Sequence, residues 1–115
     1  MRAVGETGGS VITVTEQEIA DAKAIIGRDG IGCEPASATT VAGMRKLVAD
    51  GVIKVDETVV GVLTGHLLKD TDYVMKYHNE TLRTPDDERI VSSFVNVPVR
   101  VSASRNELAK LLAAL

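Results

Sequence analysis

The clearest indication of fold class is the stretch TVVGVL at residues 58–63. It is a continuous apolar run interrupted only by Gly61, which is the pattern of a strand covered on both faces in a parallel sheet. We expect it to be the central strand. Two further stretches predict strands: Ser10–Val14, which is rich in β-branched residues, and Val97–Val101, where Pro98 lacks a ladder donor and favours an edge or strand-start position.

Helical patterns fill the chain between the first two of these strands. Thr15 and Glu18 form a capping box, in which the hydroxyl and the carboxylate each satisfy a free backbone donor, and a helix follows to about Ile26. Pro35 suits the first turn of the next helix, which we expect over residues 36–49. Apolar residues at helical spacing predict the inward faces of both helices. They are Ile19, Ala22 and Ile26 in the first helix and Val41, Met44, Leu47 and Val48 in the second.

Helical spacing is found in three other places. Residues 1–9 form a helix tail that is closed by two glycines, and another helix begins near Asp70. A polar surface loop follows at residues 79–89. Ser104 and Glu107 form a second capping box, which predicts a terminal helix with its leucines in one stripe.

Strands that alternate with helices imply right-handed crossovers and a parallel sheet. We therefore predict an α/β fold, a small three-layer α/β/α unit with about three parallel strands. Residues 1–115 form a single domain in this prediction, because the length suits one core and no linker or repeat interrupts the chain. A three-stranded layer leaves an open sheet edge, so we expect the chain to be part of something larger.

The composition argues against several classes of function. The chain is 44% hydrophobic and 25% charged, as is typical of a folded domain. A net charge of -3 and the absence of Trp argue against nucleic-acid binding. The single cysteine, Cys33, cannot form an internal disulfide or a multi-cysteine metal site, which favours a cytoplasmic setting. Because no apolar run reaches the length of a membrane span, we expect no membrane contact. From the charge and the single cysteine, we also expect no nucleic-acid partner and no metal.

Two motifs are candidates for a binding site. Ligands of open α/β sheets bind beyond the carboxyl ends of the strands, where Thr64 follows the central strand and Gly65 permits a sharp turn. The second motif is the helix start CEPASA at residues 33–38, where Glu34 or Ser37 would meet an anion or polar group. Each motif also has a purely structural interpretation, Thr64 as a turn residue and CEPASA as a helix cap.

The two motifs together resemble a known family. CEPASATTVAG at residues 33–43, followed by VVGVLTGHLLKD at residues 59–70, is similar to the carboxyl-terminal part of the threonine synthase family. This family belongs to the fold type II, tryptophan synthase beta-like group of pyridoxal-phosphate enzymes. The phrase T-G-H-x-L-K-D at residues 64–70 is the most specific signal, and the flanking segments of the chain are also similar. The resemblance implies that the chain corresponds to the carboxyl-terminal segment of the pyridoxal-phosphate-binding large domain.

The resemblance implies a lyase of threonine biosynthesis, which converts O-phosphohomoserine and water to threonine and phosphate with pyridoxal phosphate. Thr64 matches the family threonine that forms a hydrogen bond with the pyridine nitrogen of the cofactor. Glu34 matches a carboxylate near the cofactor, and Gly65 belongs to the same cofactor-binding turn. By the same resemblance, Ser37 and His66 line the site.

Nothing in the sequence matches the family's means of holding the cofactor covalently. The family places its Schiff-base lysine and its glycine-rich phosphate loop upstream, and we interpret the lysines here, Lys23 among them, as solvated surface charges. We therefore assign no catalytic residue and expect this chain alone neither to catalyse nor to bind the cofactor tightly. Leu67 departs from the family, because many relatives have glycine there, and its bulk would narrow the crevice or mark a subfamily.

Two hypotheses stay open about the function of the chain. In the first, it is a fragment or truncated relative of threonine synthase and completes a site whose upstream half another chain supplies. In the second, it is a non-catalytic α/β module that self-associates through its open sheet edge or binds a partner. A different fold type II lyase is a further alternative, because the substrate rests wholly on the resemblance.

Overall fold

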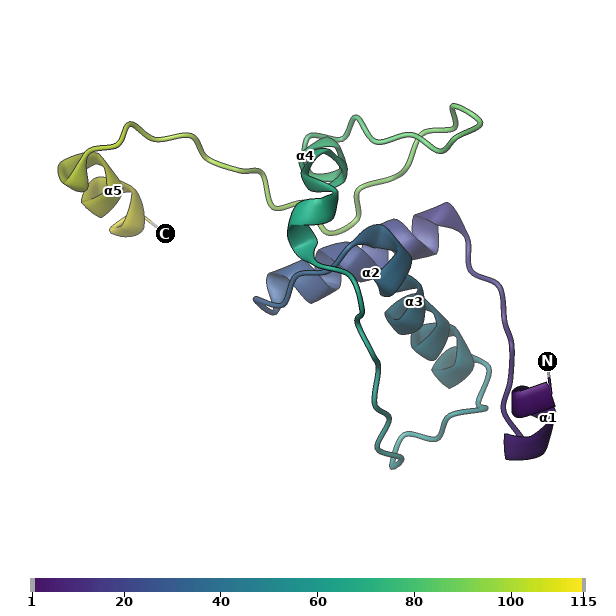
Figure 1. Ribbon diagram of the computed structural model, residues 1–115. Helices are drawn as coiled ribbons and strands as arrows, with labels where there is room; N and C mark the ends of the chain where they lie inside the picture. Colours follow the sequence, from purple (N-terminus) through teal and green to yellow (C-terminus); the bar gives the residue numbers. More distant parts are fainter. Residues whose placement is uncertain (1, 115) are drawn as a thin grey trace.

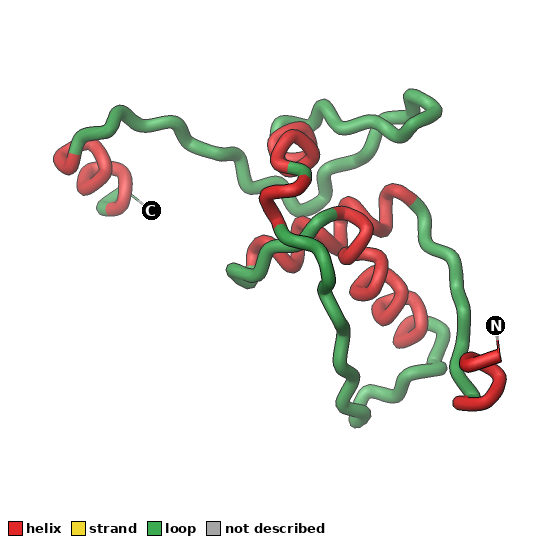
Figure 2. Tube along the Cα trace, in the orientation of Figure 1, coloured by secondary structure: helices red, strands yellow, loops and turns green. Residues whose placement is uncertain are grey.

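The computed structural model describes residues 2–114, and the regular elements in this range are helices (Figures 1 and 2). In chain order they are α1 (Arg2–Thr7), α2 (Glu16–Arg28), α3 (Pro35–Ala49), the 3-10 helix η1 (Leu67–Lys69), α4 (Thr71–His78) and α5 (Arg105–Leu112). Within the described range, no helix has both the length and the apolar character that crossing a membrane requires.

The predicted α/β fold with three parallel strands is wrong for the described residues. Segments 10–14, 58–63 and 97–101 contain no strand, and Figure 2 shows them as loops that run in different parts of the molecule. A β-strand exists only through backbone hydrogen bonds to a neighbouring strand. Because no two of these three segments lie side by side, their apolar and β-branched residues are not enough to make a sheet.

The segment predicted as the central strand lies along one side of α3. A Cβ atom on Gly61 would stand 2.9 Å from the Met44 methyl carbon, and the Thr40 hydroxyl donates to the Val62 carbonyl over 3.4 Å. On its other side, Val60 is 83% exposed and Val62 is 67% exposed. The segment is therefore covered on one face and open on the other, whereas the sequence predicts cover on both.

The two predicted capping boxes have different outcomes. At the start of α2, the Thr15 hydroxyl accepts from the Glu18 N–H over 3.2 Å, and the Glu18 carboxylate accepts from the Thr15 N–H over 2.6 Å. This capping box is confirmed. Ser104 precedes α5 as predicted, but its side chain caps nothing, so the second capping box is wrong although the helix forms.

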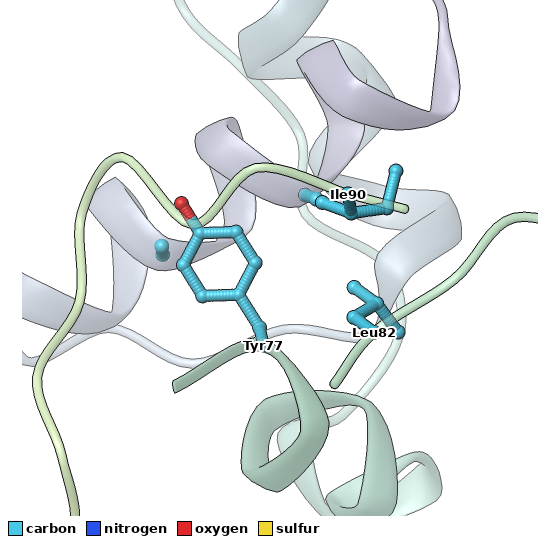
Figure 3. Packing of buried hydrophobic residues seen from close by; sticks show 5 residues of the cluster. Tyr77, Leu82 and Ile90 are labelled. Atoms are coloured by element: carbon cyan, nitrogen blue, oxygen red, sulfur yellow. The ribbon is translucent and has the colours of Figure 1, made fainter. Parts of the chain in front are cut away.

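The core consists of two clusters of buried side chains, and α2 contributes to both. The first cluster joins α2 to α4 and the chain that follows (Figure 3). It comprises Ala20, Ala24, Tyr77, Leu82 and Ile90, with Tyr73 and Phe94 packed against it. The second joins α2 to α3 and comprises Ala22, Ile26, Cys33, Ala38 and Ala42, with Val14, Ile19, Val41 and Leu63 against it. The predicted inward face of α2 is thus confirmed.

Helix α3 packs on α2 through small residues, and the prediction that all its larger apolar residues point inward is wrong. Ala38 and Ala42 are buried, whereas Val48 is 46% exposed and Met44 is half-buried. Small side chains let two helices approach closely, which leaves the bulkier residues of α3 outside the contact. They line a shallow apolar groove together with the chain that follows: Val41, Met44, Arg45, Val48, Ala49, Ile53 and Val59.

Candidate functional site

The predicted site residues meet where the chain passes the first turn of α3. Ser37 is the third residue of this helix and is only 4% exposed. Its Oγ atom accepts the N–H of Gly65 over 2.8 Å and the N–H of Thr64 over 3.2 Å, and it lies 3.2 Å from the Thr64 Oγ1 atom. One buried hydroxyl therefore fixes the turn that carries Thr64, whose own side chain is exposed.

Glu34 lies directly before α3 and packs against the same turn. Its N–H donates to the Gly65 carbonyl over 3.1 Å, and its carboxylate, 19% exposed, forms an ion pair with Lys69 at 2.5 Å. A Cβ atom on residue 65 would overlap this carboxylate, so the close approach requires glycine at position 65. Glu34 is the N-cap residue of α3, but its side chain makes no cap hydrogen bond and pairs with Lys69 instead.

His66 and Leu67 make local contacts beside this turn. The Nδ1 atom of His66 accepts from the Leu68 N–H over 3.1 Å, so the exposed imidazole caps η1. The Leu67 side chain fills the space over Gly32, where an added Cβ atom would stand 2.7 Å from it. The structure therefore brings four predicted residues into contact: Ser37, Thr64, Gly65 and Glu34. His66 follows Gly65 in the chain and contacts the backbone of η1.

Lys23 is a buried residue that we interpreted from the sequence as a surface charge, and that interpretation is wrong. It is 6% exposed, and its ammonium donates to the Cys33 carbonyl over 2.5 Å. Burial lowers the pKa of Lys23, and the nearby Cys33 thiol opposes this shift. Helical spacing would have revealed the burial, because Lys23 lies four residues after Ile19 and three before Ile26, on the inward stripe of α2.

Cys33 is also buried, and its thiol is unsuited to nucleophilic chemistry. It is 1% exposed, and burial raises the pKa of the thiol above its usual 9.0, with Lys23 acting in the opposite direction. Cys33 and Lys23 line a cavity of about 50 Å³ between α2 and α4, which is too small for a cofactor. The exposed Thr64 hydroxyl, the exposed His66 imidazole and the partly exposed Glu34 carboxylate are groups of this region that a ligand can reach.

Comparison with known proteins tests the resemblance to threonine synthases. Residues 1–65 match the family described as pyridoxal-phosphate dependent enzyme. A threonine synthase of Methanosarcina acetivorans is 54% identical over 76 residues, which are 65% of this chain and 19% of that protein. A threonine synthase of Methanocaldococcus jannaschii is 38% identical over 90 residues, 77% of this chain and 22% of that protein. A threonine synthase of Halalkalibacterium halodurans is 42% identical over 76 residues, 65% of this chain and 22% of that protein.

These matches confirm the resemblance to threonine synthases that the motifs indicate. The chain spans about a fifth of the length of the curated relatives it matches. Because the family match covers residues 1–65 of 115, the chain belongs to the pyridoxal-phosphate dependent enzyme family.

Proposed function

We propose that this chain forms the part of a threonine synthase that contacts the pyridine ring of pyridoxal phosphate, with the Thr64 hydroxyl at the ring nitrogen. One observation carries the proposal: the buried Ser37 hydroxyl holds the backbone of Thr64 and Gly65 while the Thr64 side chain stays exposed. The identity to threonine synthases supports the same substrate, O-phosphohomoserine, and the same products, threonine and phosphate.

The residues present fit the ring end of this cofactor by their chemistry. Pyridoxal phosphate, when bound, supplies an electron sink for elimination and replacement at an amino-acid substrate. A neutral hydroxyl such as that of Thr64 does not hold a pyridinium as a carboxylate would, so the ring is a weaker sink. Because one hydrogen bond contributes about 0.5 to 1.5 kcal/mol net, Thr64 orients the ring and does not hold the cofactor by itself.

Glu34 contributes a positioned negative charge beside this hydroxyl. Lys69 pairs with its carboxylate from one side, and Gly65 gives it room on the other. In the proposed site these contacts would hold the carboxylate beside the ring, where it would repel other anions and restrict the position of the ligand. The ion pair also partly neutralises the charge of Glu34, which limits its effect on the ring nitrogen.

The same proposal includes a partner and a cellular location. The partner is a polypeptide that carries the upstream part of threonine synthase, including the lysine that binds the cofactor covalently. The alternative partner is a second copy of this chain, which would cover the exposed valines Val60 and Val62. We place the chain in the cytoplasm, because its one cysteine, Cys33, is a buried free thiol.

A titration with pyridoxal phosphate tests the proposed function. The purified chain is titrated alone and together with the upstream part of the Methanosarcina acetivorans threonine synthase, and the absorbance of the bound cofactor is followed. We expect weak binding to the chain alone and saturable binding to the mixture. Thr64→Val should change the absorption band of the mixture, whereas Thr39→Val, whose hydroxyl bonds only within α3, should not. Identical bands for wild type and Thr64→Val would contradict the proposal.

A further inference from the structure

The hydrogen bonds of Ser37 use its full accepting capacity. A serine hydroxyl has one proton to donate and two lone pairs that accept. The backbone N–H groups of Gly65 and Thr64, at 2.8 and 3.2 Å from Oγ, can only donate. Both lone pairs of Ser37 are therefore engaged, and any further partner of this hydroxyl has to accept its proton.

The Thr64 hydroxyl is that further partner. Its Oγ1 atom lies 3.2 Å from the Ser37 Oγ atom. A serine within a helix often donates instead to the carbonyl four residues earlier, which here belongs to Cys33. Among the described residues no hydrogen bond joins Ser37 Oγ to that carbonyl, which accepts from the Lys23 ammonium over 2.5 Å. Among the described residues, Thr64 Oγ1 is therefore the acceptor that the structure provides for the Ser37 proton.

This direction of donation determines what Thr64 offers to a ligand. Because Thr64 accepts from Ser37, its own proton is not used between the two hydroxyls. Thr64 is exposed, so this proton is available to a molecule outside. We propose that Ser37 is a positioning residue that keeps the Thr64 hydroxyl as a hydrogen-bond donor toward the ligand.

The inference rests on the proposed function and specifies which form of the ring the site selects. A ring nitrogen with a free lone pair can accept a hydrogen bond from the Thr64 hydroxyl. A protonated nitrogen would leave that proton without a partner in the bound state, which costs binding energy. Ser37 thus favours the unprotonated ring without touching it.

The hydroxyl directions can be measured without any cofactor. In a mixture of H2O and D2O, a slowly exchanging hydroxyl splits the carbon-13 signal of its Cβ atom into two lines, and a rapidly exchanging one gives a single averaged line. We expect two lines for Ser37, whose proton is buried and bonded, and one line for Thr64, whose proton faces solvent. Two lines at Thr64, or a single line at Ser37, would overturn the inference.

Two variants make this measurement specific. Thr64→Val removes the acceptor of the Ser37 proton while keeping the shape of the side chain, so the two Ser37 lines should merge. Thr39→Val removes a hydroxyl on the same helix that donates to the Ala36 carbonyl over 2.7 Å, and the Ser37 lines should persist. If the Ser37 lines stay separate in Thr64→Val, the proton goes elsewhere and the inference is wrong.

The outcome is separable from that of the cofactor titration. The expected pattern of lines with no saturable binding of pyridoxal phosphate would reject the proposed function and leave the hydroxyl directions standing. The reverse pattern of lines together with saturable binding would reject only the role of Ser37.

Discussion

Lys23 and Ser37 are the buried polar residues of the described chain, and each binds backbone from another segment. Lys23 holds the Cys33 carbonyl at the entrance to α3, and Ser37 holds the N–H groups of Thr64 and Gly65. A buried polar group without a hydrogen-bond partner costs free energy. The position of each bound backbone segment therefore depends on the one side chain, Lys23 or Ser37, that binds it. The backbone of the candidate site is thus held by two buried side chains.

Replacement of Ser37 by alanine should reduce the free energy of unfolding by about 1 to 3 kcal/mol, because two backbone N–H groups lose their acceptor. Urea denaturation followed by circular dichroism measures this change. Thr39→Val, which leaves the turn intact, should stay within about 0.5 kcal/mol of wild type. Equal stability of the two variants would show that Ser37 does not hold the turn.

The burial of Lys23 predicts slow chemical modification. Its side chain is buried and its ammonium donates to the Cys33 carbonyl, which keeps a reagent away from the amine, whereas the side chain of Lys110 on α5 is 76% exposed. With a limiting amount of an acylating reagent at neutral pH, we expect Lys110 to be labelled early and Lys23 last. Mass spectrometry of the digested protein reports the order. Labelling of Lys23 at the rate of Lys110 would contradict its burial.

Tyr73 predicts a loss of stability at alkaline pH. Burial first, and then nearby carboxylates, raise its pKa from 10.0 to about 12 in the folded chain. Between these values the folded state binds more protons than the unfolded state, so the free energy of unfolding falls as the pH rises from 10 to 12. Tyr73→Phe should make this fall less steep, as measured by urea denaturation at several pH values. A slope that the substitution does not change would exclude this contribution.

At the scale of elements, the capping boxes of α2 and α5 offer a direct comparison. Thr15 and Glu18 make both hydrogen bonds of the box, and Ser104 makes none with its side chain. Thr15→Ala should therefore reduce the stability of the protein by about 1 kcal/mol, whereas Ser104→Ala should have little effect. Thermal unfolding of both variants measures the difference. A larger loss for Ser104→Ala would reverse the assignment of the two caps.

Helices could be predicted from the sequence because their signals are local. Thr15, Glu18 and Pro35 mark helix starts through contacts within a few residues, and the structure has both helices where they predict them. TVVGVL at residues 58–63 describes an extended apolar segment equally well, but a sheet also needs a neighbouring strand, which no local pattern supplies. For the same reason, the motifs identify Thr64 and Glu34 as candidates, while the anchoring of Thr64 by Ser37 depends on a contact between residues 27 positions apart.

At the scale of the whole molecule, the chain is more extended than a compact domain of its length. Its radius of gyration is 17.3 Å, whereas a compact chain of this length would have about 13 Å. Helices α1 and α5 lie at opposite ends of the molecule, and neither contributes a buried residue (Figure 1). Exposed valines in segment 58–63 add apolar surface. This shape is what we expect of a chain whose exposed surface is covered by the proposed partner.

The exposed valines predict how the chain associates. Without the upstream half, we expect the wild-type chain to self-associate at high concentration, with a mass above 12.2 kDa in sedimentation equilibrium. Val60→Lys combined with Val62→Lys should restore the monomer, because two charges oppose burial of that face. Val55→Lys changes an exposed valine in the preceding turn, outside segment 58–63, and should leave association unchanged if that segment forms the contact. Equal association of both variants would exclude segment 58–63 as the contact.

The pairing of α2 with α3 also has a consequence for the order of folding. These helices follow each other along the chain, and their contact is the most extensive between any two helices of the described residues. Contacts between neighbouring segments close short loops and form quickly. During synthesis, α2 and α3 can therefore pack together while segment 58–63 is still inside the ribosome. Thr64 then reaches a Ser37 that is already in place, so the last step in building the turn is the docking of one hydroxyl onto another.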